Sequence, residues 1–501
     1  MKSGRTVAPR LSKSKYVSGL QCHKKLWWEI HEPDAPELEP DAAQQFIFDQ
    51  GHEVGRVAQT YVPGGVLIDV PHTERQRRLE ETDAALRDGA TILYEPAFEH
   101  DGVLVLADIL ERVRGGWNLI EVKSSTKLKS QHVPDVAVQT HVLRGAGLTV
   151  KRAELMHLNR ECRYPDLSNL FHREDLMPIV EEMLDDIPAE VRAMHRMLRG
   201  PLPEVEIGPQ CRDPYECPFI ERCWPEQTPD AIGNLYRLSQ TRREQYQDEG
   251  YESIADLPDD TGLTAIQARQ RRALRAGALV VGPGLAAALE EFKRPLAYLD
   301  FETVGFAIPI WDGCRPYDQV PVQLSVHHRP TRGRMRHDEW LADGHKDPRE
   351  ALARKLIAFT RGTKTIVAYN APFERGCIRR LREHLPHHAA DLDAIDARLA
   401  DLLPVVRNHL YHPAFEGRFG LKQVVPALIP RLRYDDLEVA GGAAASQMLM
   451  TLITKGEAIK PRERGRLRRE LLKYCAMDTL ALMKLHEELE KLARGAPGKE
   501  S

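Results

Sequence analysis

The stretch LAYLDFE, residues 296–302, predicts a strand in a buried sheet. Its apolar residues Leu299 and Phe301 alternate with the acidic residues Asp300 and Glu302, and successive side chains of a strand point to opposite faces. Both carboxylates therefore leave one face, while the apolar side chains enter the core. Because a buried acidic pair is costly unless it is neutralised, we interpret Asp300 and Glu302 as ligands of a cation.

The residues that follow alternate between strand and helix patterns, which is typical of an α/β layer architecture. Further strands are expected at 321–328, about 335–341 and 365–369, and helices at 348–361, from 372 and at about 466–492. The segment TIVAYNAPFE, residues 365–374, runs from a strand into a helix and places Glu374 in the first helical turn. Near the end of the chain, Tyr474 and Asp478 lie four residues apart, which puts both on one helix face.

These pieces, in this order, resemble the DEDD exonucleases of the ribonuclease H-like superfamily, in the tyrosine subtype. The resemblance covers roughly residues 295–490 and implies a two-metal site for Mg²⁺ or Mn²⁺ that cuts from a 3′ end. It also implies that Tyr474 orients the attacking water. The acids that it implies as metal ligands are Asp300, Glu302, Glu374 and Asp478. Glu374 stands where the superfamily usually has Asp.

The earlier half of the chain contains a second acidic pattern in VLVLADILERVRGGWNLIEVKSS, residues 103–125. Gly115-Gly116 predicts a two-residue hairpin turn, which would pair residue 108 with residue 123. Alternation then brings Asp108, Glu121 and Lys123 together on one sheet face. Two carboxylates suit Mg²⁺ or Mn²⁺, and the lysine could orient a water or neutralise developing charge. A surface ion pair is the alternative.

With GHEVG at residues 51–55 and Gln139, this pattern resembles a RecB-type PD-(D/E)XK nuclease over roughly residues 10–225. The resemblance implies that Asp108, Glu121, Lys123 and Gln139 form the catalytic set. The first helix of that family usually supplies a His where this chain has Gly55. Glu53 or Glu95 could take that role.

Cysteine spacing predicts a further metal site. Three cysteines follow one another with five residues between each pair, and regular spacing of this kind in a reducing compartment points to a metal or a cluster. The proposed ligands are Cys22, Cys211, Cys217 and Cys223. Iron–sulfur members of the RecB-like family hold a 4Fe-4S cluster with one early and three late cysteines, although their late spacing is usually two and five. Zinc is the alternative. The other cysteines are expected to be buried or incidental thiols.

Composition indicates an ordinary globular protein. The chain has 501 residues, 74 acidic against 70 basic ones, a formal charge of −4 and 42% hydrophobic residues, which suits two or three domains. We expect a PD-(D/E)XK-like α/β core (residues 1–227), a short helical linker (228–290) and a ribonuclease H-like α/β domain (291–501). In the linker, residues 246–274 suggest two helices around a turn, either helix-hairpin-helix-like or a plain linker. No membrane-spanning run and no signal peptide are visible, so a cytoplasmic location is expected.

The whole chain resembles an uncharacterised bacterial family, a family of unknown function that joins a RecB-like nuclease half to a DEDD-like half. The resemblance implies a metal-dependent nuclease that acts on DNA more readily than on RNA, with no membrane partner and with protein partners left open. Repair, defence and nucleic-acid turnover all fit. The alternative is a nucleic-acid-binding or scaffold protein in which one or both centres are inactive.

Overall fold

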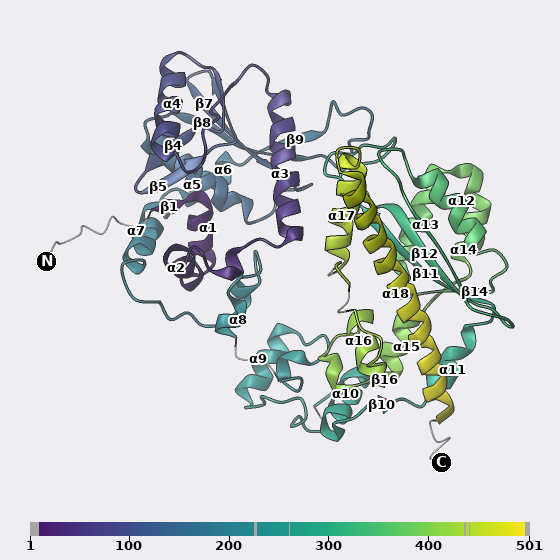
Figure 1. Ribbon diagram of the computed structural model, residues 1–501. Helices are drawn as coiled ribbons and strands as arrows, with labels where there is room; N and C mark the ends of the chain where they lie inside the picture. Colours follow the sequence, from purple (N-terminus) through teal and green to yellow (C-terminus); the bar gives the residue numbers. More distant parts are fainter. Residues whose placement is uncertain (1–9, 225–227, 260, 435–436, 440, 496–501) are drawn as a thin grey trace. The chain divides into compact units, whose positions relative to one another are not determined.

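The computed structural model describes residues 10–224, 228–259, 261–434, 437–439 and 441–495 (Figure 1). The chain divides into two compact units. Unit 1 consists of Met1–Pro225 and Phe306–Tyr317, and unit 2 of Glu226–Gly305 and Asp318–Ser501. Each unit combines helices with mixed sheets, which confirms the multidomain α/β class in this coarse form.

Two segments belong to a different unit than the sequence-based boundaries suggest. The helical segment after residue 228 is grouped with unit 2 and not set apart as a linker domain. Residues 306–317 are grouped with unit 1, because Ala307 packs in a cluster with Val54 and Leu158. The phenol of Tyr317 also donates a hydrogen bond to the backbone oxygen of Ser124, at 2.8 Å.

Unit 1 is built around a six-stranded sheet of order β2-β3-β6-β7-β8-β9 and a three-stranded sheet of order β1-β5-β4. Its helices are α1 (Lys13–Gln21), α2 (His23–His31), α3 (Ala42–Tyr61), α4 (Arg75–Arg87), α5 (His132–Gly145), α6 (Met177–Met183), α7 (Ile187–Met197) and α8 (Ile220–Cys223). Its strands are β1 (Leu11–Ser12), β2 (Val66–Leu67), β3 (Ile92–Tyr94), β4 (Ala97–His100), β5 (Val103–Leu106), β6 (Ile109–Val113), β7 (Gly116–Lys123), β8 (Val150–Leu158) and β9 (Phe171–Asp175).

Residues 91–98 and residues 103–113 each contain parts of two strands, and in both cases the two strands belong to different sheets. The first break lies at Glu95, whose φ is 57°, followed by Pro96, which has no N–H for a sheet ladder. The second break lies at Ala107 and Asp108. At the breaks the segments stay together, because the Glu95 N–H donates to the backbone oxygen of Asp108 at 3.1 Å.

The β6–β7 hairpin has a different register from the predicted one. Val113 pairs with Gly116, and Ile109 with Ile120, so the turn is Arg114-Gly115 and not Gly115-Gly116. Gly115 has a φ of 82°, which glycine adopts without strain. The observed pairing differs from the predicted pairing by two residues. A shift by two residues leaves each side chain on the same face of the sheet.

Unit 2 is built around a five-stranded sheet of order β13-β12-β11-β14-β15, with a two-stranded sheet β10-β16. Its helices are α9 (Gln240–Asp248), α10 (Ala265–Ala276), α11 (Leu285–Ala288), α12 (Arg349–Phe359), α13 (Pro372–His384), α14 (Ala389–Asp396), α15 (Leu402–His409), α16 (Leu421–Leu428), α17 (Gly442–Lys455) and α18 (Pro461–Gly495). Its strands are β10 (Val280–Val281), β11 (Leu296–Val304), β12 (Val320–Arg329), β13 (Arg336–Leu341), β14 (Thr365–Ala368), β15 (Leu399–Asp401) and β16 (Leu410–Tyr411).

The central strand β11 lies between an antiparallel neighbour, β12, and a parallel neighbour, β14. Its two faces contribute to two hydrophobic clusters. Leu299 and Phe301 pack with residues of α12 and α13, whereas Leu296 and Tyr298 pack with residues of α18. The long helix α18, drawn in yellow in Figure 1, therefore covers the same face of β11 that carries Asp300 and Glu302.

The helical pair that the sequence suggests within residues 246–274 is placed differently. Helix α9 ends at Asp248 and α10 begins at Ala265, and the described residues between them form no helix. Helix α10 starts with a capping box in which Thr264 and Gln267 each bond the backbone N–H of the other. The prediction that the first helix of this pair lies within residues 246–258 is therefore wrong.

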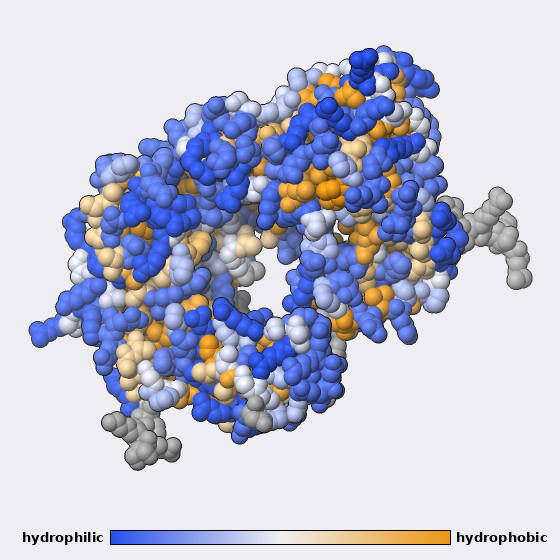
Figure 2. All heavy atoms as spheres, turned by 180° about the vertical axis from the view of Figure 1, so that it is seen from behind, coloured by the Kyte–Doolittle hydropathy of each residue, from blue (hydrophilic) through white to orange (hydrophobic). Residues whose placement is uncertain are grey.

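The face drawn in Figure 2 is mostly hydrophilic, with apolar residues interspersed. Among the described residues, no helix combines the length and the apolar character that crossing a membrane requires.

Candidate metal centres

The unit 2 centre begins with the two carboxylates of β11. Asp300 pairs with Ser325 of β12, and Glu302 with Gln323, before the register shifts between Glu302 and Thr303. The even-numbered side chains of β11 face α18. The strand thus presents both carboxylates to the helix that carries Tyr474 and Asp478, as the sequence predicted.

Two further acids join them. Burial raises the pKa of Asp300 well above its ordinary value, and the neighbouring charges of Glu302, Asp478 and Glu374 raise it further. These charge effects relate Asp300 to the other three predicted acids of unit 2, and the acids with ligand atoms within 4.8 Å of one another are Asp300 and Glu302. Burial, followed by the charge of Asp478, raises the pKa of Glu302 to about 8. Burial also raises the pKa of Glu374 to about 8.

Glu374 is almost fully buried, with 3% of its surface exposed. Its Oε2 atom is buried, and the described part of the chain offers it no hydrogen-bond partner. An unpaired buried carboxylate oxygen is expensive. A cation would remove that cost.

Tyr474 lies at this centre with a partner that the sequence did not indicate. The Lys422 Nζ atom of α16 donates a hydrogen bond to the Tyr474 phenol oxygen at 2.6 Å and lies 4.2 Å from the centroid of its ring. Burial raises the pKa values of Glu302 and Asp478, and the charge of Lys422 partly offsets this rise. The lysine is therefore part of the centre.

Cys475, expected to be a buried or incidental thiol, is buried and contacts the same acids. Its Sγ atom donates to Asp300 Oδ2 at 3.3 Å. Ligand atoms of Asp300, Glu302 and Cys475 all lie within 4.8 Å of one another. The sequence held a signal for this contact, because Cys475 directly follows Tyr474 on the helix that carries Asp478.

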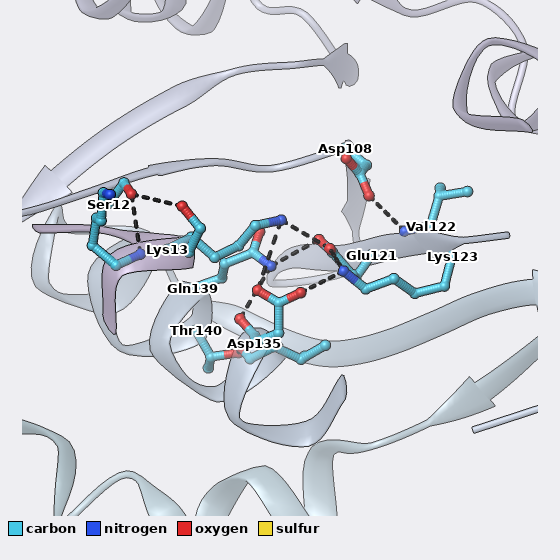
Figure 3. Close-up of polar contacts among 12 residues, drawn as sticks. Ser12, Lys13, Asp108, Glu121, Val122, Lys123, Asp135, Gln139 and Thr140 are labelled. Carbon is cyan, nitrogen blue, oxygen red and sulfur yellow. Dashed lines mark hydrogen bonds and ion pairs between the residues drawn. The ribbon is translucent and has the colours of Figure 1, made fainter. Parts of the chain in front are cut away.

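The unit 1 centre forms where β7 faces α5 (Figure 3). Glu121 is 1% exposed. Its Oε1 atom accepts a hydrogen bond from Lys123 Nζ at 2.7 Å, and its Oε2 atom accepts one from Gln139 Nε2 at 2.7 Å. Burial alone would raise the pKa of Glu121, but the ammonium groups of Lys123 and Lys13 outweigh burial and hold it well below its ordinary value.

Asp108 lies at the break between β5 and β6. The last pair of the β6–β7 ladder is Ile109 with Ile120, so continuing the ladder by one residue places Asp108 opposite Glu121 and not opposite Lys123. Its Oδ2 atom accepts the Val122 N–H at 2.6 Å. Burial, followed by the charge of Glu121, raises the pKa of Asp108 to about 8. A bound cation would favour the ionised form of this carboxyl.

The two acids considered as substitutes for the usual helical ligand have different environments. The charge of Glu95 raises the pKa of Asp108. Burial is the main cause that raises the pKa of Glu95 itself. Glu53 is 51% exposed at its side chain and pairs with Arg56 on the same helix. Within the described residues, no contact joins Glu53 to the centre. The geometry therefore favours Glu95.

Two residues of this centre gave no signal in the sequence. Asp135 of α5 is 8% exposed and pairs with Lys123. Lys13, the first residue of α1, donates from Nζ to Glu121 Oε1 at 2.8 Å. Both reach the centre through tertiary packing, so no local spacing marks them.

The segments that carry the four cysteines of the predicted cluster lie next to one another. Cys22 lies at the junction of α1 and α2. Burial raises the pKa values of Cys217 and Cys223, and the charges of Cys22 and Cys211 raise both further. Gln21 ties the junction to the late cysteines, because its Nε2 atom donates to the backbone oxygens of Gln210 at 2.7 Å and of Tyr215 at 2.6 Å.

The thiols are not tightly clustered. In the described part of the chain, the groupings of three ligand atoms within 4.8 Å of one another do not include these cysteines.

Comparison with known proteins gives one family match. Residues 297–420 match a domain of unknown function, DUF2779. The matched segment contains Asp300, Glu302 and Glu374 and ends before α16. No curated protein matches the chain. The match assigns no reaction, so the functional argument depends on the geometry of the two centres.

Proposed function

We propose that this protein is a metal-dependent nuclease that hydrolyses phosphodiester bonds, with DNA as its preferred substrate and RNA open to the unit 2 centre. The observation that carries the proposal is the buried set of acids in unit 2. Asp300 and Glu302 of β11 have ligand atoms within 4.8 Å of each other and of Cys475 Sγ on α18, and the charges of Asp478 and Glu374 help to raise the pKa of Asp300. The pKa values of Glu302 and Glu374 are both raised to about 8.

An acid cluster of this kind destabilises the folded protein unless cations neutralise it. Carboxylate oxygens are the ligands that Mg²⁺ and Mn²⁺ prefer. Asp300, Glu302, Glu374 and Asp478 would hold these ions. Bound divalent ions lower the pKa of water and stabilise charge on both oxygens of a phosphodiester displacement.

The residues around the acids supply the remaining functions of a DEDD-type centre. The Tyr474 phenol oxygen accepts a hydrogen bond from Lys422, which leaves its own O–H free to donate to a water or a carboxylate. Tyr474 would therefore orient the attacking water, while Lys422 fixes the phenol. The five-stranded mixed sheet with helices packed on both faces of β11 supports a ribonuclease H-like domain.

In unit 1, we propose that Asp108 and Glu121, with Glu95, hold a divalent ion in a PD-(D/E)XK-type centre. Lys123 would orient the water or neutralise the phosphate, and Gln139 fixes the orientation of Glu121 through its hydrogen bond to Oε2. Cys22, Cys211, Cys217 and Cys223 would hold a 4Fe-4S cluster, with zinc as the alternative. The cluster would join the α1–α2 junction to the segment that ends unit 1.

The second candidate function is a nucleic-acid-binding or scaffold protein in which one or both centres are inactive. Two observations favour it. The first helix of the PD-(D/E)XK resemblance supplies no ligand, because Glu53 faces solvent. Glu374 has one methylene more than the Asp that is usual in DEDD enzymes, which changes the reach of its carboxylate.

Cleavage assays distinguish the two functions. Purified full-length protein is incubated with 5′-labelled and 3′-labelled single-stranded DNA, duplex DNA and RNA, with Mn²⁺, Mg²⁺ or EDTA. The nuclease proposal predicts cleavage that requires the metal and that falls in Asp108→Asn, in Asp300→Asn, or in both. Metal-independent cleavage, or cleavage unchanged in the double variant, would refute the proposal. Binding without cleavage would support the scaffold.

A further inference from the structure

Lys13 places a second ammonium group in the unit 1 centre (Figure 3). Its Nζ atom donates to Glu121 Oε1 at 2.8 Å and lies 3.8 Å from Asp135 Oδ1. It therefore bridges a carboxylate of β7 and a carboxylate of α5. Lys123 bridges the same pair, through Glu121 Oε1 at 2.7 Å and through Asp135 Oδ2.

The backbone holds Lys13 firmly in this place. Strand β1 pairs in parallel with β5, with Leu11 opposite Val103 and Ser12 opposite Leu104. Ser12 then caps α1, because its Oγ atom accepts the Lys15 N–H at 3.2 Å. The lysine thus leaves a junction fixed by a sheet on one side and by a capped helix on the other.

The position of Lys13 is unfavourable for helix stability. It is the first residue of α1, and the first turn contains no acidic residue. A positive charge opposes the helix dipole at this end of a helix. The ion pairs with Glu121 and Asp135 offset this cost, so the lysine serves the centre and not the helix.

The carboxylates divide into two groups by their partners. Glu121 and Asp135 share two lysines, whereas within the described residues no ion pair reaches Asp108. Asp108 instead accepts a hydrogen bond from the Val122 N–H through its Oδ2 atom, at 2.6 Å. Of Glu121, Asp135 and Asp108, the acid without an ion pair among the described residues is therefore Asp108, which lies opposite Glu121 in the extended register.

We propose that Lys13 takes the place of a second divalent cation, so that the unit 1 centre binds one Mg²⁺ or Mn²⁺ on the side of Asp108. The inference rests on the proposed function of unit 1 and specifies its metal stoichiometry. An ammonium group neutralises carboxylate and phosphate charge, but it cannot lower the pKa of a bound water as a divalent ion does. Lys13 and Lys123 would thus neutralise negative charge, whereas the single divalent ion would lower the pKa of the bound water.

Mn²⁺ binding to the full-length protein tests the proposal. The parent carries Asp300→Asn and Asp478→Asn, which disable the unit 2 centre, and bound Mn²⁺ is counted by titration calorimetry and by the loss of the free-ion EPR signal. We expect one ion in the parent and two in Lys13→Met. Lys13→Arg keeps the charge and should bind one ion. Lys127→Met, at an exposed lysine of unit 1, is the matched control and should also bind one.

The rate of DNA cleavage provides a second measurement. The dependence on Mn²⁺ concentration should change from first order in the parent to second order in Lys13→Met. Two ions in the parent, or an unchanged count and affinity in a folded Lys13→Met, would overturn the proposal. Loss of all binding in Lys13→Met would overturn it as well. If Lys13→Met does not fold, the count in the parent alone decides.

Failure of the proposed function gives a different result. Asp108→Asn in the same parent should lose both the single Mn²⁺ ion and the cleavage. If Asp108→Asn keeps both, the unit 1 centre itself is misassigned, whatever Lys13→Met shows.

Discussion

The Lys422 ammonium group of α16 lies 2.6 Å from the phenol oxygen of Tyr474 on α18. Lys422 also lies 5.3 Å from the ring centroid of Tyr434. The hydrogen bond gives the phenol one orientation beside the acids of unit 2. A residue outside the acid pattern thus controls how the tyrosine faces the centre.

Replacing Tyr474 or Lys422 should slow cleavage at the unit 2 centre. In an Asp108→Asn background, we expect Tyr474→Phe to lower the cleavage rate about 10²-fold, because it removes the phenol that would orient the attacking water. Lys422→Met should cost a similar factor in kcat with little change in KM, and Lys422→Arg should recover part of it. Lys455→Met, at an exposed lysine of α17, is the control. Equal rates in Lys422→Met and Lys455→Met would contradict the assignment.

The stability of the metal-free protein should fall as pH rises. Burial raises the pKa values of Glu302 and Glu374 to about 8, above their ordinary value of 4.5. The folded state therefore holds these protons to a higher pH than the unfolded state does. Their contribution to stability is present below pH 4.5 and is lost as pH rises toward 8.

Urea unfolding of unit 2 in EDTA measures this effect. Between pH 6 and pH 8.5 we expect a loss on the order of 2 kcal/mol. Glu302→Gln should reduce the slope, because it removes one ionisation. Saturating Mg²⁺ should restore the stability at pH 8.5, since the ion binds the ionised carboxylates. A stability that rises with pH in EDTA would contradict the assigned pKa shifts.

Glu95 and Glu53 form a matched pair for testing the third ligand of unit 1. Glu95 lies at the centre, whereas Glu53 is exposed and pairs with Arg56. In an Asp300→Asn background, Glu95→Gln should lower cleavage roughly 10²- to 10³-fold and weaken Mn²⁺ binding. Glu53→Gln should leave both unchanged. The reverse outcome would show that α3 supplies the ligand after all.

The cysteine cluster should give the purified protein a colour. If thiolates bind iron, anaerobically purified protein is brown, absorbs broadly near ~400 nm from thiolate-to-iron charge transfer, and contains iron. Cys22→Ser should lose most of the iron and lower the unfolding temperature of unit 1. Cys162→Ser, at a buried cysteine outside the group, should retain the iron. Colourless protein with one zinc per chain would favour the alternative.

Sequence patterns located the acids of both centres because those patterns are local. Alternation in LDFE placed Asp300 and Glu302 on one face, and helical spacing aligned Tyr474 with Asp478. The hairpin register was wrong by two residues, because adjacent glycines allow either turn and only the fold decides which one adopts the positive φ of Gly115. The acids still converge, since a shift of two keeps the face.

The other residues of the centres depend on tertiary packing. Lys13 reaches Glu121 across 108 positions of sequence, and Lys422 reaches Tyr474 across 52. No periodicity connects such positions. Glu95 was named as a substitute ligand without a geometric reason. The structure places it at the strand break, where its φ is 57° and its backbone N–H donates to the backbone oxygen of Asp108.

Anomalous scattering from crystals soaked in Mn²⁺ tests the central claim most directly, because it locates divalent ions without relying on activity. We expect peaks bound by Asp300, Glu302 and Asp478 in unit 2, and one peak bound by Asp108 and Glu121 in unit 1. Asp300→Asn should abolish the first set and keep the second. Saturated crystals with no peak at either acid cluster would show that neither centre binds a divalent ion.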